Sequence, residues 1–223
     1  MRRFTLLIAG LILLAGCLNV GSFAQDTIKG NGDIVTENRD VGHFSELRIT
    51  GSNSTVVYGD EDGPIRITGD SNILENIDST VQGSRLVITA RENAFLNPTK
   101  RVEIEIPSTS LNATSVSGSN RLELKNIHHQ TFTIRGSGST EIFAGGYTDI
   151  LEIRMSGSSR IIAPDLVSES ASIRTSGSSK AEINASGKLE SRSSGSSEII
   201  VHGNPSEISN QSSGSSRLRT VEN

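Results

Sequence analysis

The feature that most limits how this chain can fold is a Ser-Gly-Ser tripeptide that recurs six times in its second half. The intervals between successive copies are 20, 19, 20, 18 and 19 residues. The glycines of the six copies are Gly118, Gly138, Gly157, Gly177, Gly195 and Gly214. A period this short and constant predicts one small structural unit copied along the chain. A flexible Gly/Ser linker would have the same composition but no register.

The residues between the tripeptides have a period of two. Apolar side chains stand five and seven positions after the first serine of a copy, as Leu122 and Leu124 do. A second apolar pair precedes the next copy, as Phe132 and Ile134 do. Because side chains alternate across a strand, this spacing predicts strands with one apolar face. No unit has the three-to-four spacing that a helix needs, so we expect an all-β chain.

A unit of two short strands cannot bury its apolar face alone, so successive copies must stack on one another. The sequence therefore predicts a single-stranded parallel β-helix, or β-solenoid, with about 19 residues per coil in the C-terminal half. We expect it to be right-handed, because parallel crossovers nearly always are. Glycine would allow the bend at each corner, and serine hydroxyls would bond to backbone groups there. The serines then repeat because the corner repeats, and no Gly-x-Ser-x-Gly pattern suggests a nucleophile.

The N-terminus has the pattern of a bacterial export signal. Arg2 and Arg3 precede a short apolar run that ends in Leu14-Ala15-Gly16-Cys17, which resembles a lipoprotein lipobox. We expect residues 1–16 to be the signal peptide and Cys17, the only cysteine, to be lipidated. The alternative is ordinary cleavage after Ala24. Either way the mature protein is expected to be exported, to the cell envelope with a lipid anchor in the membrane or, without the anchor, as a secreted protein.

The N-terminal half shows the same pattern less regularly. Gly51-Ser52-Asn53-Ser54 is an irregular copy of the corner. Strands are predicted around it and beyond it, at 44–49, 55–58, 65–68, 86–89 and 102–106, with loops at 72–79 and 93–98. We therefore expect the same solenoid with longer coils. The predicted organisation is a linker at 17–28 followed by one domain at 29–223.

Charge is nearly balanced after the signal. Residues 117–223 hold 11 basic and 11 acidic side chains, so nucleic acid is not expected as a partner. Four arginines, two residues before four of the corners, should form one outward column: Arg135, Arg154, Arg174 and Arg192. One hypothesis is a cationic stripe for an acidic glycan or a lipid head group, and the alternative is a solubilising outer face. A second column has mixed signs and should form ordinary surface pairs: Arg121, Glu141, Arg160, Lys180, Glu198 and Arg217.

The remaining polar clusters do not indicate a metal, a cofactor or a catalytic centre. His128 and His129 adjoin in a turn, but His43 and His202 are isolated, and metal sites need several ligands at suitable spacing. The acidic turn at 60–62 could hold calcium, although carboxylates in a Gly-Pro turn are more often solvated. We therefore expect no enzyme activity.

Several motifs resemble a known family. The first runs from Gly32-Asp33-Ile34-Val35 through Arg39 to Phe44 and Leu47–Gly51. The second is Gly69-Asp70-Ser71-Asn72-Ile73-Leu74, with Leu86-Val87-Ile88 after it. The third is the Ser-Gly-Ser ladder, which has His202-Gly203-Asn204-Pro205 before its last corner. The chain resembles the putative auto-transporter adhesin head GIN domain, a domain of unknown function (DUF2807). Members often have Ser-Gly-Ser-Gly, whereas this chain has Ser or Thr at the fourth place and Asn120 in the first copy. The resemblance implies a β-helical domain on exported, often lipid-anchored bacterial proteins.

The functional expectation is an adhesin-like or structural scaffold that makes many weak contacts along a repetitive surface. Its partners would be a glycan, an envelope protein or neighbouring copies of itself. One alternative is a polysaccharide-active β-helix enzyme, which would need carboxylates clustered in a cleft. Another is an envelope assembly factor that acts through a protein partner.

Overall fold

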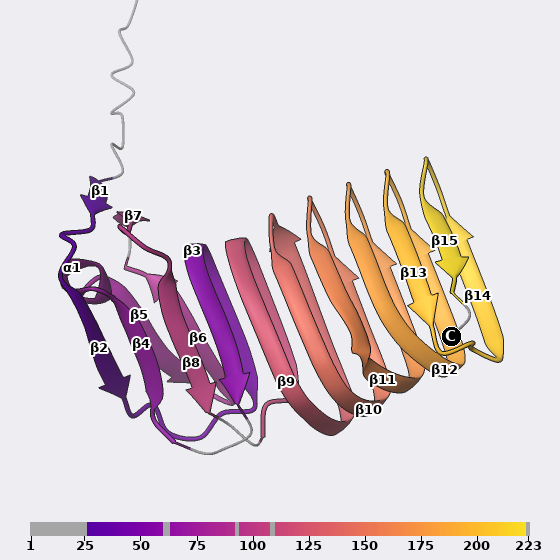
Figure 1. Cartoon of the computed structure of the whole chain (residues 1–223), viewed down its shortest axis with the longest axis horizontal. Coiled ribbons are helices and arrows are strands. Elements are labelled where there is room, and N and C mark those ends of the chain that lie inside the picture. The colour runs from indigo at the N-terminus through magenta and orange to yellow at the C-terminus, as the bar shows by residue number, and fades with distance from the viewer. Residues whose placement is uncertain (1–25, 60–62, 92–93, 108–109, 222–223) are drawn as a thin grey trace, which may run out of the picture.

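The computed structural model describes residues 26–59, 63–91, 94–107 and 110–221. Within these ranges nearly all regular structure is strand, and the helix has four residues, which confirms the all-β prediction. Figure 1 shows the second half as a row of similar bent repeats lying side by side. The leader, Cys17 and the acidic turn at 60–62 lie outside the described residues.

Parallel strand pairing joins the repeats of the second half. Ile153 lies opposite both Ile134 and Ile173, so equivalent residues of three successive copies are in register. The strands are β9 (Ala113–Gly138), β10 (Glu141–Met155), β11 (Arg160–Thr175), β12 (Lys180–Ser193), β13 (Glu198–His202), β14 (Glu207–Ser212) and β15 (Arg217–Thr220). The period of the tripeptide is therefore the number of residues that separates equivalent positions in two neighbouring repeats.

Each Ser-Gly-Ser is a corner, and the corners stack on one another. Gly177 has φ +86°, in the left-handed region that favours glycine. The N–H of Ser178 donates to the carbonyl oxygen of Gly157 at 2.8 Å, which joins one corner to the previous one. The buried hydroxyl belongs to the fourth residue: Ser179 Oγ donates to the carbonyl oxygen of Ser176 at 3.2 Å. The tripeptide's own serines are mostly exposed, and at the fourth place Ser159, Ser179 and Ser197 bond to the corner's backbone, whereas the buried Thr140 hydroxyl does not.

The core is a set of columns running through the repeats. Ile134, Ile153 and Ile173 are fully or almost fully buried in one column. The column continues with Ser191, which is buried, and ends at Asn210, which is exposed. The apolar lining thus thins toward the C-terminal end of the stack, and the last repeat is not covered by another.

The N-terminal half differs from the longer, less regular coils of the same solenoid that we expected. Strand β3 (Glu46–Gly59) contains the irregular corner, and its Gly51 lies opposite Gly118. Strands β6 (Arg85–Ala90) and β8 (Val102–Pro107) pair in parallel with the other side of β3. Strand β3 therefore lies between β9 on one side and both β6 and β8 on the other, although it precedes all three in the chain. Successive segments do not stack in chain order here.

Antiparallel pairs complete the N-terminal end. They join β2 (Ile34–Arg39) to β4 (Ile65–Asp70), β4 to β8, and β5 (Ile77–Gln82) to β6. The two expected loops contain regular structure instead: α1 (Ser71–Leu74), the start of β5, and β7 (Ala94–Asn97), which pairs with β1 (Asp26–Lys29). No Ser-Gly-Ser corner occurs in this part, and β5 turns back into β6 through Gly83, whose φ is +66°.

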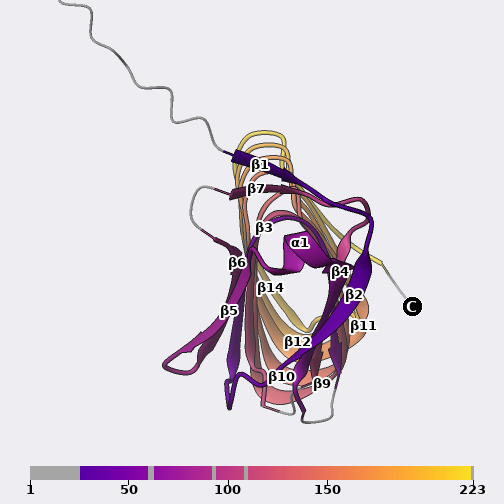
Figure 2. The same ribbon diagram turned by 90° about the vertical axis from the view of Figure 1, so that its left-hand side faces the viewer.

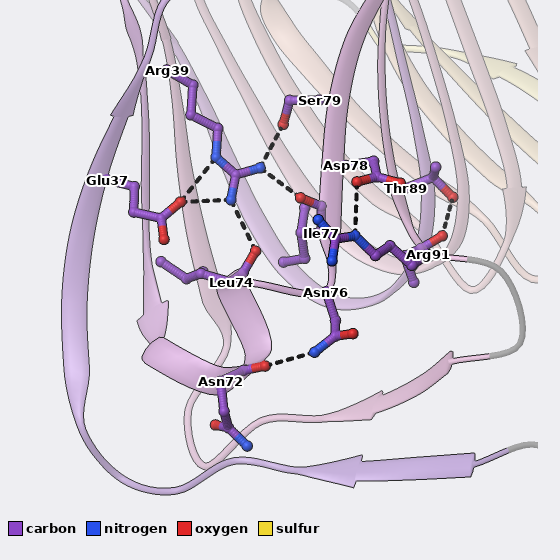
Figure 3. A network of polar contacts seen from close by, with 11 residues as sticks. Glu37, Arg39, Asn72, Leu74, Asn76, Ile77, Asp78, Ser79, Thr89 and Arg91 are labelled. Carbon is purple, nitrogen blue, oxygen red and sulfur yellow. Dashed lines mark hydrogen bonds and ion pairs between the residues drawn. The ribbon is translucent and has the colours of Figure 1, made fainter.

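Helix α1 plugs this end of the stack. Ile73 and Leu74 are fully buried, and Figure 2 shows the helix across the mouth of the coils. The guanidinium of Arg39 fixes it in place by donating to the carbonyl oxygens of Leu74 at 2.9 Å and Ile77 at 2.6 Å (Figure 3). The carboxylate of Glu37 accepts from the same guanidinium at 2.7 Å. One arginine thus ties β2, α1 and β5 together.

The buried carboxylate of Asp70 joins the segment before β2 to the N-terminal end of the stack, the cap that α1 forms. Asp70 is fully buried and accepts hydrogen bonds from the N–H of Gly32 at 2.7 Å and from the N–H of Thr99 at 2.9 Å. The Thr99 hydroxyl donates a third, at 2.7 Å. Burial alone would raise the pKa of Asp70, but these hydrogen bonds outweigh it and hold the pKa below its ordinary value. The motif around Asp70 therefore has a structural role.

Candidate functional site

The four predicted arginines stand in one column on the outside of the stack. Arg154 lies opposite Arg135 and Arg174, and Arg174 lies opposite Arg192. Neighbouring strands are about 4.8 Å apart, so the α-carbons of the column repeat at that interval. Arg135 is half-buried and the other three are exposed. The structure thus brings together all four residues that the sequence placed in this column.

The column is longer than the sequence suggested. Arg48 stands three residues before the corner Gly51, as Arg135 stands three before Gly138. Arg48 lies opposite Ser115, and both line a groove of about 260 Å³ together with Arg135. The order along the stack is therefore Arg48, Ser115, Arg135, Arg154, Arg174, Arg192 and Gln211. The irregular corner at Gly51 is the sequence signal that places Arg48 in this column.

Most of the column has no carboxylate partner. Within the described ranges, no side-chain hydrogen bond or ion pair joins Arg48, Arg135, Arg154 or Arg174 to another residue. Arg192 differs, because it pairs with Glu190 at 2.9 Å and donates to the side-chain oxygen of Gln211 at 3.2 Å. Stacked like charges repel one another when nothing neutralises them. Arg48, Arg135, Arg154 and Arg174 therefore form a line of positive charges without ion-pair partners among the described residues.

The mixed column after the corners behaves in the opposite way. Arg121 pairs with Glu141 at 2.9 Å, and Lys180 pairs with Glu198 at 3.1 Å. The hydrogen bond from Lys180 lowers the pKa of Glu198, while burial acts weakly against it. Arg121 also lies over the ring of Phe143, 4.1 Å from its centroid. The predicted surface pairs form here, so the two sides of the stack differ in how their charges are compensated.

A shallow groove adjoins the arginine column near the last corners. Its volume is about 440 Å³, and its lining includes Arg174, Arg192, Ser194, Gln211 and Ser213. Guanidinium groups bind carboxylates and phosphates through paired N–H donors, and exposed hydroxyls add further donors. This arrangement can hold anionic groups at several successive positions.

A larger groove lies elsewhere and is lined by one cation and two carboxylates. It measures about 800 Å³ on the outer face of β4, β8 and β3, and its lining includes Glu103, Glu105 and Arg66. Arg66 forms an ion pair with Glu105. An acid and nucleophile pair needs two carboxylates with different environments and room between them. In this groove one of the two carboxylates is already engaged by a cation.

The histidines are not assembled into a metal site. In the part of the chain that the structure describes, no group of three or more His, Cys, Asp or Glu is placed to hold a metal ion. His129 packs near Phe132, with ring centroids 6.1 Å apart, and its pKa is lowered by burial and by His128. His202 Nε2 lies 3.0 Å from a carboxylate oxygen of Glu182.

No helix in the described ranges is long and apolar enough to cross a membrane.

Comparison with known families assigns this chain. The model of the family described as "Putative auto-transporter adhesin, head GIN domain" matches residues 43–205. The chain belongs to this family. The match begins just before β3 and ends before β14, so it spans the arginine column from Arg48 to Arg192. The description of a GIN domain as an adhesin head indicates a protein exposed at the cell surface.

Solved structures share the fold of this GIN domain. A putative adhesin from Bacteroides fragilis is 18% identical, with a TM-score of 0.69 over 87% of this chain and 100% of that one. A putative adhesin from Parabacteroides distasonis is 16% identical, with a TM-score of 0.64 over 89% and 98%. A putative lipid binding protein from the same species is 21% identical, with a TM-score of 0.54 over 88% and 100%. No protein of curated function matches the chain.

Proposed function

We propose that this GIN-domain protein is an exported, non-enzymatic surface scaffold that holds an acidic glycan along its arginine column. In this proposal the stacked repeats form a rigid, right-handed β-solenoid, and a lipid on Cys17 anchors it to the membrane. The observation that carries the proposal is the contrast in charge pairing. Arg135, Arg154 and Arg174 have no anionic partner in the described structure, whereas Arg121, Arg160 and Lys180 on the other side of the stack are paired; Arg217, in the last repeat, is the exception there.

The binding would be multivalent. One exposed guanidinium–carboxylate pair is worth at most about 1 kcal/mol, which is too little to retain a ligand. After the first contact, the next carboxylate of the same polymer is held close to the next arginine, so each further contact is effectively intramolecular. Salt should weaken this binding strongly, because the column is exposed.

The shape of the column favours a linear polymer as the ligand. The arginines succeed one another along the stack, one per repeat, and Ser115 is the one interruption between Arg48 and Arg192. A polysaccharide with a carboxylate on each sugar repeats its charge in the same one-dimensional way. A lipid head group would engage one or two arginines and leave the rest unpaired.

Binding of the full chain to immobilised polygalacturonate tests the proposal, with neutral dextran as the reference surface. Replacing Arg135, Arg154, Arg174 and Arg192 by Gln should weaken binding by more than tenfold. The matched control replaces four cations that have carboxylate partners: Arg66, Arg121, Arg160 and Lys180. Both variants lose the same charge, so an equal loss of binding would mean that only net charge matters. Failure of the unmodified chain to bind would also refute the proposal, and binding to anionic vesicles alone would favour a lipid ligand.

The lipid anchor can be tested separately. Cells that express the chain and are labelled with a fatty-acid analogue should yield a labelled protein, and Cys17→Ser should abolish the label. An unlabelled protein whose mature N-terminus is Gln25 would show ordinary cleavage after Ala24 instead.

A further inference from the structure

The two ends of the stack differ in how well their core is covered. At the N-terminal end, α1 covers the core and buries Ile73 and Leu74 completely. At the C-terminal end, strands β14 and β15 are the last of their ladders. Ile208 of β14 belongs to the core column of Leu189, yet its side chain is 44% exposed. Leu218 of β15 is half-buried. Among the described residues, the C-terminal end thus exposes apolar side chains and two strand edges without a partner strand.

This end has the form of a step. Strand β14 pairs directly with β12, whereas β15 pairs with β13, which in turn pairs with β12. Strand β15 therefore projects one strand spacing, about 4.8 Å, beyond β14. The two edge strands lie on either side of the last corner and run in opposite directions (Figure 1).

We propose that a second copy of this chain pairs with this end, tail to tail, so that β14 of each copy adds to β15 of the other. A two-fold axis parallel to the strands produces this arrangement. Rotation about this axis places β14 of the second copy beside β15 of the first and leaves the direction of each strand unchanged. Because β14 and β15 run in opposite directions, both new pairs are antiparallel. The projecting strand of one copy fills the recess of the other, and both edges are paired at the same spacing.

The step excludes the other way of joining the two ends. An axis perpendicular to the strands would place β14 on β14 and β15 on β15. The two projecting strands would then meet first, and the β14 strands would stay about three strand spacings apart. That arrangement would also set Arg217 and Arg219 of one copy against the same residues of the other, and like charges that face each other across a strand pair are destabilising.

Charge complementarity favours the arrangement that the step allows. The outward side chains of β14 include Glu207 and Gln211, and those of β15 are Arg217 and Arg219. Residues at equal distances from Gly214 come opposite each other, so Gln211 meets Arg217 of the second copy. Glu207 lies diagonally from Arg219 of the second copy, within reach of a long side chain. Within one copy Glu207 pairs with Lys188 and Arg219 pairs with Glu198, each at 3.4 Å, so the contact would join these pairs into one row of alternating charges. The inward residues Ile208 and Leu218 are covered at the same junction.

Such a contact closes on itself. Each copy has one open end and one plugged end, so pairing gives a dimer and not a fibre. The area at the end of one repeat is small, so we expect a weak interface that buries less than about 1,200 Å² in total, with micromolar affinity. Anchoring at a membrane would raise the local concentration and favour the dimer.

Sedimentation velocity on the full chain in detergent measures the association. The expected result is a monomer–dimer equilibrium that shifts with concentration. Arg217→Glu with Arg219→Glu should raise the dissociation constant at least tenfold, and adding Glu207→Arg to that pair should recover most of the affinity. The matched control reverses two exposed cations at the other end, Lys100→Glu with Arg101→Glu, and should leave the dissociation constant unchanged.

Cross-linking tests the geometry. With Cys17 replaced by Ser, the pair Gln211→Cys and Arg217→Cys should form a disulfide-linked dimer on mild oxidation, whereas Gln211→Cys alone should not. A monomer at every concentration, a larger polymer, a dimer insensitive to the Arg217 and Arg219 reversal, or a dimer cross-linked through Gln211→Cys alone would each overturn the proposal. These experiments measure association between copies and not binding of polygalacturonate, so their failure would leave the proposed glycan site standing.

Discussion

Substitution of a corner glycine should separate the stacking of corners from their backbone conformation. Gly177 has φ +86°, and a Cβ there would lie 2.6 Å from the carbonyl oxygen of Gly157. Gly83 has φ +66°, and a Cβ there would meet nothing within 4 Å. Alanine at either position suffers the same kind of backbone strain, but only at Gly177 does it also press on the neighbouring repeat.

The two costs can be worked out separately. Holding a non-glycine residue in the left-handed region costs about 1–2 kcal/mol, which is the whole penalty expected for Gly83→Ala. In Gly177→Ala the methyl group must push the Gly157 carbonyl away, which strains the stack by a further 1–3 kcal/mol or so. It would also stretch the 2.8 Å hydrogen bond from Ser178, worth about 1 kcal/mol. We expect a total of about 3–6 kcal/mol for Gly177→Ala.

Urea denaturation followed by far-ultraviolet circular dichroism gives both free energies of unfolding. Gly177→Ala should have a clearly lower midpoint than Gly83→Ala, with similar slopes. Equal losses in the two variants would show that the corners do not touch, and the stacking described for Gly157 and Gly177 would then be wrong.

Three further predictions concern the core, the first corner and the cap. Ile173→Ala, in a fully buried position, should cost about 2–5 kcal/mol of unfolding free energy, whereas Ile208→Ala should cost less than about 1 kcal/mol because Ile208 is 44% exposed. Equal costs would mean that the last repeat is covered in the monomer. Asn120→Ala should cost about 2–4 kcal/mol of unfolding free energy, because the Asn120 side chain donates to Gly51 and Ser117 and accepts from Ser54. Asn120→Ser, which places the serine of later repeats here, should recover part of this free energy. An Asn120→Ala variant as stable as the unmodified chain would refute these hydrogen bonds. The pKa of Asp70 is lower in the folded than in the unfolded chain, so its stabilisation is present above about pH 3.9 and is lost as the pH falls through the folded value. Acid titration of the unfolding midpoint should show a shallower decline for Asp70→Asn, and identical profiles would contradict this role.

The regular half of the fold was predictable because its information is local. Each repeat carries its own corner glycine and its own apolar pairs, so aligning the copies on Gly138, Gly157 and Gly177 gives the register of the strands directly. The same alignment placed Arg135 and Arg154 side by side. Their lack of carboxylate partners could not be read from it, since Glu152 stands two residues from Arg154 on the same face yet forms no ion pair with it.

The N-terminal half was predicted less well because its pairing is not periodic. The strands around Ile67, Leu86 and Ile104 were found, since each has an alternating apolar face. Their partners were not, because antiparallel pairing and the position of β3 between β8 and β9 depend on contacts between residues far apart in the chain. Helix α1 has only four residues and could not show a helical period.

The arginine column as a multivalent site is tested most directly by the affinity of oligogalacturonides of increasing length, measured by isothermal titration calorimetry at low salt. The account predicts that affinity rises steeply with each added sugar until the oligomer spans the column. From Arg135 to Arg192 that length is three strand spacings, or about 14 Å, and it grows to about 24 Å if Arg48 takes part. Replacing Arg154 and Arg174 by Gln should flatten this dependence. An affinity that does not change with length, or a length dependence that survives both substitutions, would contradict the account.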